Sequence, residues 1–254
     1  MAPTTDAATG ERVRYAFASD VGRRREKNED AVAVIAPESD QDWAFDLAAV
    51  VCDGVGGQPH GDMASRIAVE MLVQALSRKD GALLTNRLVR AIEAANEAVR
   101  EFARRAADGA PLASTVVVAV LRERALTVAH VGDSRAYRLR GGKLDVLTLD
   151  HSVVQEQVRH GLLDAAAAKG HLLRSRLSRA VGSEEGITAD VAEHRLQGGD
   201  VVLVCSDGLH AFVDETLVAA AIDDDLQASA QRLVTLANEA GGKDNCTVAL
   251  LRTR

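Results

Sequence analysis

The chain contains few cysteines and has no long apolar run. Its three cysteines are widely spaced among 254 residues. That is not the pattern of a disulfide framework or a zinc knuckle, and it suits a reducing compartment. The longest apolar stretch, residues 113–121, is far too short to span a bilayer, and residues 1–9 lack the basic and apolar regions of a signal peptide. We therefore expect a cytoplasmic protein with no membrane partner.

An excess of positive charge is also absent. Thirty Lys and Arg residues against 37 Asp and Glu residues leave a formal net charge of -7. A protein that binds nucleic acid usually presents a basic field to the phosphates, so we expect no nucleic-acid partner. Only four prolines occur, and no linker divides the chain. We expect a monomer with a flexible tail over residues 1–12 and a single domain over residues 13–254.

Hydrophobic patterning predicts an α+β protein. Apolar residues repeat every fourth position over residues 63–75 and 88–102, which predicts two helices that pack side by side. A third helix is expected over residues 226–240, after three consecutive aspartates. Runs of Val, Ala and aromatic residues predict strands, and Gly141-Gly142 predicts a hairpin. The expected strands are 14–19, 31–36, 45–52, 114–121, 125–131, 135–139, 143–147, 191–194, 201–205 and 247–251.

Acidic residues recur where the predicted strands begin or end, each near glycine or asparagine. They are Glu29, Asp30, Asp53, Asp133, Asp207 and Asp244. If these carboxylates converge in one cleft, they need divalent cations to neutralise their mutual repulsion. Any single one of these acids, taken alone, fits a turn or capping residue better than a metal ligand, because glycine and aspartate are the usual turn residues. Spacing alone leaves both interpretations open.

Six motifs in order carry a resemblance to a known family. The chain resembles the PPM (type 2C) metal-dependent serine/threonine protein phosphatases in their compact bacterial form, and the match runs from about residue 13 to 252. The family fold is an αββα sandwich of two antiparallel sheets flanked by helix pairs, which agrees with the patterning. The motifs span residues 19–30, 53–57 with 61–65, 129–137, 150–152, 206–209 and 244–247.

The resemblance implies a two-metal core. Asp53 resembles the aspartate that bridges two metal ions, and Gly54 resembles the residue whose backbone carbonyl binds the second ion. Asp207 and Asp244 resemble the other ligands of the first ion. The implied cofactors are Mn²⁺ or Mg²⁺, because an oxygen-only ligand set suits these ions better than Zn²⁺. Together with the phosphate-binding residue below, these three aspartates form the expected catalytic set.

The resemblance also assigns residues around that core. Arg25 resembles the arginine that binds the substrate phosphate, for which its planar guanidinium is well shaped. Glu29 and Asp30 resemble acids that hold metal-bound waters. Asp133, with Asp207, resembles the pair that holds a third, weaker ion. Val55 stands where some relatives have a histidine, which leaves the general acid open between a metal-bound water, the stronger candidate, and His60 in the adjacent loop.

The expected activity is hydrolysis of phosphoserine and phosphothreonine by a metal-activated water, opposing a serine/threonine kinase. The expected partners are phosphorylated proteins, including such a kinase or its substrates. The alternative is a non-catalytic member of the same fold that binds phosphoprotein, whose mark would be loss of the metal acids. A two-metal nuclease would need a basic groove that the chain lacks. Residues 153–176 resemble the family's flap, and they are equally consistent with a solvated helical excursion.

Overall fold

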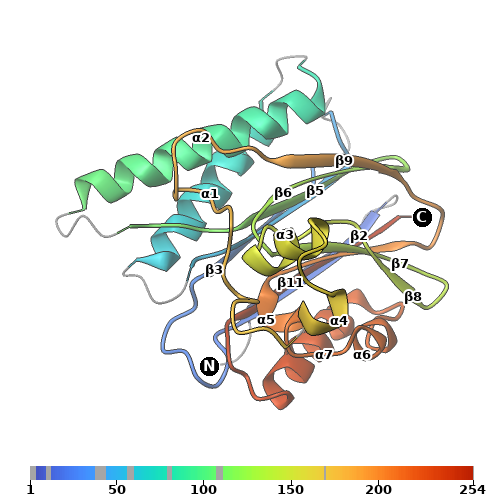
Figure 1. The fold of residues 1–254 in the computed structure, drawn as a ribbon. Coiled ribbons are helices and arrows are strands. Elements are labelled where there is room, and N and C mark those ends of the chain that lie inside the picture. Colours follow the sequence, from blue (N-terminus) through green and yellow to red (C-terminus); the bar gives the residue numbers. More distant parts are fainter. Residues whose placement is uncertain are drawn as a thin grey trace.

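The structure, a computed structural model, describes most of the chain. The described residues are 4–9, 13–37, 44–55, 60–78, 82–106, 111–168 and 170–253. Their strands form two antiparallel sheets stacked face to face, with helices on both outer surfaces (Figure 1). This arrangement confirms the predicted αββα sandwich.

A six-stranded sheet forms one of the two layers. Its order is β1 (Thr4–Thr9), β2 (Val13–Asp20), β11 (Cys246–Thr253), β10 (Val201–Cys205), β7 (Arg135–Arg140) and β8 (Lys143–Val146). Strands β7 and β8 are antiparallel neighbours joined by Gly141 and Gly142, both with positive φ. Because glycine adopts positive φ without steric cost, this turn forms the predicted hairpin.

A five-stranded sheet forms the second layer. Its order is β3 (Asp30–Ile35), β4 (Leu47–Asp53), β5 (Val116–Arg122), β6 (Ala125–Val131) and β9 (Asp190–Arg195). Side chains on the inner faces of both sheets, among them Val51, Val117, Val204 and Ala249, pack into a common buried layer. This double-sided burial explains why these strands are rich in Val and Ala throughout instead of alternating with polar residues.

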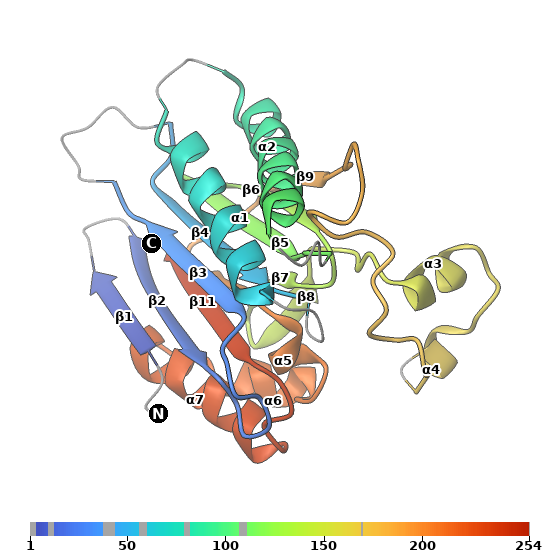
Figure 2. The same ribbon diagram turned by 90° about the vertical axis from the view of Figure 1, so that its left-hand side faces the viewer.

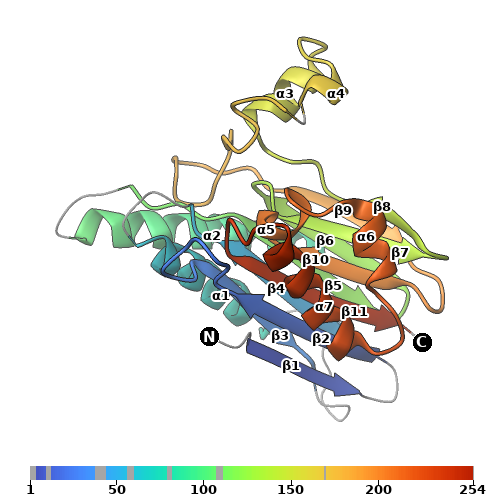
Figure 3. The ribbon, with the colours of Figure 1, turned by 90° about the horizontal axis from the view of Figure 1, so that it is seen from below.

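Helices cover the outer face of each sheet. The helices α1 (Gly61–Leu76) and α2 (Leu84–Arg105) pack against each other and cover the five-stranded sheet. The six-stranded sheet is covered by α5 (Asp207–His210), α6 (Glu215–Ala220) and α7 (Leu226–Glu239). Two short helices, α3 (Val153–Arg159) and α4 (Ala165–Ala168), stand apart from the sandwich (Figures 2 and 3). They lie within the predicted flap.

The apolar stripe of α1 differs in detail from the expectation. Met63, Ile67 and Met71 are only partly buried, whereas the fully buried positions include Ala68 and Leu72, one residue further on. The helix contacts both the sheet and α2, so its buried surface spans a wider arc than one stripe. The predicted stripe of α2 is confirmed.

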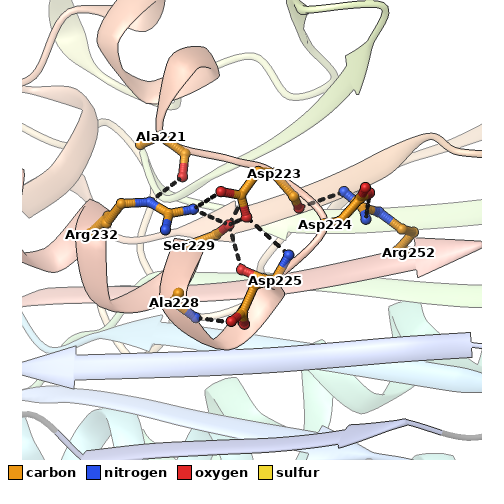
Figure 4. Close-up of polar contacts among 8 residues, drawn as sticks. All are labelled: Ala221, Asp223, Asp224, Asp225, Ala228, Ser229, Arg232 and Arg252. Carbon is orange, nitrogen blue, oxygen red and sulfur yellow. Dashed lines mark hydrogen bonds and ion pairs between the residues drawn. The ribbon is translucent and has the colours of Figure 1, made fainter.

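Helix α7 begins where the three aspartates predicted it. The Asp225 side chain accepts a hydrogen bond of 3.0 Å from the Ala228 N–H and caps the helix (Figure 4). The two preceding aspartates form ion pairs instead, Asp223 with Arg232 at 2.7 Å and Asp224 with Arg252 at 2.6 Å. The cluster therefore anchors the helix start to the last strand.

Part of the expected N-terminal tail is a strand. Residues 4–9 of the expected tail form β1, which pairs with β2, whereas residues 1–3 and 10–12 lie outside the described residues. All three cysteines are buried in strands. In the part of the chain that the structure describes, no helix combines the length and apolarity that a membrane span requires.

Candidate active site

The acidic strand ends meet at one end of the sandwich. Asp53 is the last residue of β4, and Asp133 lies between β6 and β7. Asp207 starts α5 just after β10, and Asp244 lies just before β11. Because β10 and β11 are antiparallel, the end of the first lies beside the start of the second. Both sheets therefore contribute carboxylates to the same edge.

A cavity of about 540 Å³ opens at this edge. Its lining includes four of the predicted acids, Asp53, Asp133, Asp207 and Asp244, together with Arg25. The structure thus places all four residues of the expected catalytic set, and the acid expected at a third ion, on one cavity.

Close backbone contacts explain two of the Asp-Gly pairs. A Cβ on Gly208 would lie 1.8 Å from the Asn245 carbonyl oxygen, and one on Gly54 would lie 2.2 Å from the Gly61 carbonyl oxygen. Neither Gly54 nor Gly208 has a positive φ, so these glycines are needed for space and not for a turn. The close contact at Gly208 places the start of α5 directly against Asn245, the residue that follows Asp244.

Asn245 holds the loop between β2 and β3 in place. Its side-chain amide donates hydrogen bonds to the carbonyl oxygens of Val21, at 2.8 Å, and Lys27, at 2.9 Å. Its side-chain oxygen accepts a hydrogen bond of 2.9 Å from the Glu29 N–H. Asn245 is buried, so these three bonds fix the loop that carries Arg25.

Arg25 faces the acidic cluster directly. Its Nη2 donates a hydrogen bond of 2.8 Å to Oδ2 of Asp244. This bond is the main cause of a raised pKa for Arg25, which burial opposes and the charges of Glu29 and Asp53 support. The guanidinium is therefore a permanent cation at the cavity, suited to bind an anionic substrate.

Burial and mutual repulsion raise the pKa of the clustered acids. The pKa of Asp53 is well above its usual value, through burial first and then through the charges of Asp30 and Asp207. Burial, followed by the charge of Asp244, raises the pKa of Asp207 to about 6. The pKa of Asp133 is also raised, first by burial and then by the charge of Asp207.

Asp30 lies beside the cavity rather than on it. It pairs with Asp53 across β3 and β4, and its Oδ2 accepts a hydrogen bond of 2.7 Å from the Ser206 hydroxyl. Its other oxygen, Oδ1, is buried and has no hydrogen-bond partner among the described residues. Burial raises the pKa of Asp30 to about 7, although the hydrogen bond from Ser206 opposes the shift.

Glu29 and Gly54 also sit behind the cavity lining. The Glu29 carboxylate lies at the start of α1, with Oε1 2.8 Å from the position that a Cβ on Gly61 would occupy. Its backbone oxygen accepts a hydrogen bond of 3.1 Å from the Gly54 N–H. Burial is the first cause of the raised pKa of Glu29. Both residues are thus adjacent to the end of β4 where Asp53 lies.

The donor set of this edge fits divalent cations. Its ligand atoms are carboxylate oxygens, and one of them, Oδ1 of Asp30, is buried without a partner. Arg25 contacts one of the four aspartates, Asp244, through a hydrogen bond, and burial and mutual repulsion disfavour ionisation of the clustered acids, so they must either take up protons or bind metal ions. Oxygen-only sites of this kind suit Mg²⁺ or Mn²⁺.

Thr115 is a cavity residue that the sequence did not indicate. Its hydroxyl accepts a hydrogen bond of 2.9 Å from the Asp53 N–H and lies 2.7 Å from the Ser134 hydroxyl. A Cβ on Gly132 would lie 2.6 Å from the Thr115 side chain. Thr115 therefore joins the segments that carry Asp53 and Asp133, but one threonine ahead of a Val-rich strand gives no signal of this.

The position of the general acid holds no titratable group. Val55 lines the cavity, whereas His60 is exposed and does not line it. Of the predicted flap, the described residues that line the cavity are Ser175 and Arg176, and residues 177–180 continue the same wall. We call residues 175–180 the wall segment.

Comparison with known proteins identifies the family. A family model described as protein phosphatase 2C matches residues 22–241. The chain belongs to this family.

Curated relatives cover nearly the whole chain. A serine/threonine phosphatase, Stp, of Listeria monocytogenes is 35% identical over 242 residues, which are 92% of this chain and 94% of that protein. The serine/threonine protein phosphatase PstP of Mycobacterium tuberculosis is 33% identical over 239 residues, 94% of this chain but 44% of that longer protein.

Solved structures share the fold. The crystal structure of the M. tuberculosis phosphatase PstP superposes with a TM-score of 0.85 at 30% identity, covering 96% of this chain and 99% of that one. A Streptococcus agalactiae serine/threonine phosphatase superposes with a TM-score of 0.87 at 29% identity, covering 95% and 100%.

Proposed function

We propose that this chain is a metal-dependent phosphoprotein phosphatase that hydrolyses phosphoserine and phosphothreonine. The observation that carries the proposal is that Asp53, Asp133, Asp207, Asp244 and Arg25 line a single cavity. Membership of the protein phosphatase 2C family and the names of the relatives, serine/threonine phosphatases, support it.

The acids of the cavity are assigned to the cations. Asp53, Asp207, Asp244 and the Gly54 carbonyl would hold two ions. When bound, divalent cations supply an activated water and neutralise phosphate charge. A solved structure of the PstP catalytic domain contains two manganese ions, which supports this number and Mn²⁺ as the ion. Mg²⁺ has the same preference for oxygen ligands.

Acids around this core have separate tasks. Glu29 and Asp30, behind the cavity lining, would hold waters around the ions. Asp133, together with Asp207, would hold a third, weaker ion at the cavity. These assignments rest on the family resemblance and agree with where the side chains lie.

Arg25 binds and orients the phosphate in this account. Its guanidinium offers several donors in one plane, and only Nη2 is engaged, by Asp244, among the described residues. Val55 has no proton to donate, so the proton for the departing serine or threonine oxygen comes from water in the cavity.

A non-catalytic phosphoprotein-binding protein is the alternative. The intact acids argue against it, since Asp53, Asp207 and Asp244 all lie on the cavity. A binding protein has no need of a costly cluster of like charges. As further predictions from the sequence, the protein opposes a serine/threonine kinase, acts in the cytoplasm and is a monomer.

Hydrolysis assays test the proposal. A phosphothreonine peptide and an aryl phosphate are incubated with the protein in Mn²⁺, in Mg²⁺ or in excess chelator. We expect phosphate release with either ion and none with chelator. Turnover that survives full chelation would refute the metal-dependent mechanism, and binding of the phosphopeptide without turnover would favour the alternative.

A further inference from the structure

Arg179 lies on the wall segment of the cavity, and no sequence pattern pointed to it. Its Nη1 donates hydrogen bonds to the Thr188 carbonyl oxygen, at 2.9 Å, and to Oδ1 of Asp190, at 3.0 Å. Its Nε and Nη2 have no hydrogen-bond partner within the described ranges. The guanidinium is therefore held at one nitrogen, and its other donors are available to a ligand.

Asp190 is itself fixed in position. It is the first residue of β9 and pairs with His130 of β6. Its Oδ2 lies 3.4 Å from Nε2 of His151, which is buried. Although burial opposes ionisation, the hydrogen bond from Arg179 and the proximity of His151 lower the pKa of Asp190. An ionised, anchored carboxylate thus sits directly behind Arg179.

The neighbouring histidines support Asp190 and do not form a metal site. Ligand atoms of His130, His151 and Asp190 lie within 4.8 Å of one another, which is close enough to hold an ion. However, the Gly132 N–H donates to Nδ1 of His151 at 3.2 Å, so the neutral ring carries its proton on Nε2. That nitrogen faces Asp190 with a proton and has no lone pair for a metal. His130 stacks on His151, with ring centroids 4.6 Å apart, and steadies it.

We propose that Arg179 is a substrate-contacting residue that binds an acidic side chain beside the phosphorylated residue, and that Asp190 is its positioning residue. The inference rests on the proposed function. Arg176 lines the same wall, so two cations of the wall segment face the cavity. Arg25 and the acids approach from the sandwich instead. A substrate with its phosphate at Arg25 therefore presents its flanking residues to the wall segment.

The test compares KM and kcat for two phosphothreonine peptides, one with acidic and one with alanine flanks, and for an aryl phosphate. We expect the wild type to have a lower KM for the acidic peptide. Arg179→Ala and Asp190→Ala should each raise that KM by about threefold to tenfold and leave the other two substrates and kcat nearly unchanged. Because Asp190 acts through Arg179, the double variant should be no worse than Arg179→Ala.

Asp145→Ala is the matched control. Asp145 pairs with Arg138 at 2.8 Å and with Lys143 at 2.9 Å, but none of the three lines the cavity. This variant removes an aspartate–arginine pair of similar length, so it should leave the KM ratio of the two peptides at the wild-type value. A changed ratio in Asp145→Ala would show that the readout is not specific and would overturn the inference.

Three further outcomes are decisive. A wild type that hydrolyses the aryl phosphate while Arg179→Ala keeps the wild-type KM ratio overturns this inference and leaves the proposed function standing. A wild type without turnover of any substrate overturns both. Loss of one bound metal ion per chain in Asp190→Ala, measured by elemental analysis, would make Asp190 a metal ligand and overturn its positioning role.

Discussion

Arg25 and Asp244 are 219 residues apart in the sequence, and a hydrogen bond of 2.8 Å joins them at the cavity. Asn245, the residue after Asp244, binds the loop that carries Arg25 through three hydrogen bonds. A proposed phosphate ligand and a proposed cation ligand are thus held next to each other by one short segment. The substrate and the cations are expected to meet at this point.

Arg25→Ala should weaken substrate binding and spare cation binding. The variant loses the planar donor to the phosphate but keeps every carboxylate. KM for the phosphopeptide and the inhibition constant for phosphate should therefore both rise by about tenfold or more. Steady-state kinetics with a manganese titration measures this. Arg24→Ala, at an exposed neighbour outside the cavity lining, is the control and should behave as wild type. A wild-type KM with lost manganese binding would give Arg25 a structural task instead.

Asp207→Asn should stabilise the protein when chelator is present at pH 8. The pKa of Asp207 in the folded chain, about 6, lies above its ordinary value of about 3.9 in an unfolded chain. The folded state therefore binds this proton more tightly, and the stability that it contributes is complete below pH ~4 and lost as the pH rises through about 6. Asparagine does not titrate, so the variant escapes this loss, which for a shift of about two pKa units is at most about 3 kcal/mol.

Denaturant unfolding at pH 5 and pH 8 measures this difference. With saturating Mn²⁺ the wild type should gain more stability than the variant, because ligand binding stabilises the wild type by about 2.7 kcal/mol at one hundred times Kd and the variant much less. Equal manganese stabilisation of both proteins would show that Asp207 is not a ligand.

Gly208→Ala should destabilise the protein. The added Cβ would lie 1.8 Å from the Asn245 carbonyl oxygen, so the start of α5 must move away from Asp244. We expect a cost of about 1–3 kcal/mol in the free energy of unfolding, with lowered activity. Gly170→Ala, where nothing lies within 4 Å of the new Cβ, is the matched control and should cost little. Equal unfolding free energies for the two variants would contradict the close contact.

Asp133→Ala should lower kcat while two tightly bound ions remain. Asp133 lies on the cavity, and its backbone oxygen, which accepts a hydrogen bond of 2.9 Å from Nε2 of His210, is retained in the variant. An outer ion held mostly by water binds weakly, so its loss should cost about tenfold in kcat and little in KM. Calorimetric manganese titration with steady-state kinetics decides this. Abolished tight binding would place Asp133 in the core.

The sequence predicts most strands and helices and the acidic residues of the cavity, but not the contacts that hold those acids in position. Strands such as β10 and β11 are recognisable because buried strands need continuous Val, Leu and Ala. The first strand, Thr4–Thr9, was not predicted because its sequence has no continuous run of apolar residues. It is placed by its pairing with β2. Whether an Asp-Gly pair forms a turn or a close contact depends on the opposing backbone, which no local pattern encodes.

The pair of Arg179 and Asp190 could not be predicted from the sequence for the same reason. Arg179 and Asp190 lie eleven residues apart, on either side of a loop, and acquire a role only through the fold. Asn245 was visible within a motif, yet its three bonds reach residues more than two hundred positions away. Tertiary contacts of this kind determine the site geometry, and periodicity does not report them.

The initial rate of phosphothreonine-peptide hydrolysis by wild type and Asp53→Asn, measured at equal Mn²⁺ with circular dichroism to verify folding, tests the central claim most directly. Asp53 ends β4 on the cavity and is the carboxylate assigned to both ions. We predict a fast, manganese-dependent rate for the wild type and a loss of at least about a hundredfold for the folded variant. A folded Asp53→Asn protein with the wild-type rate would contradict the account.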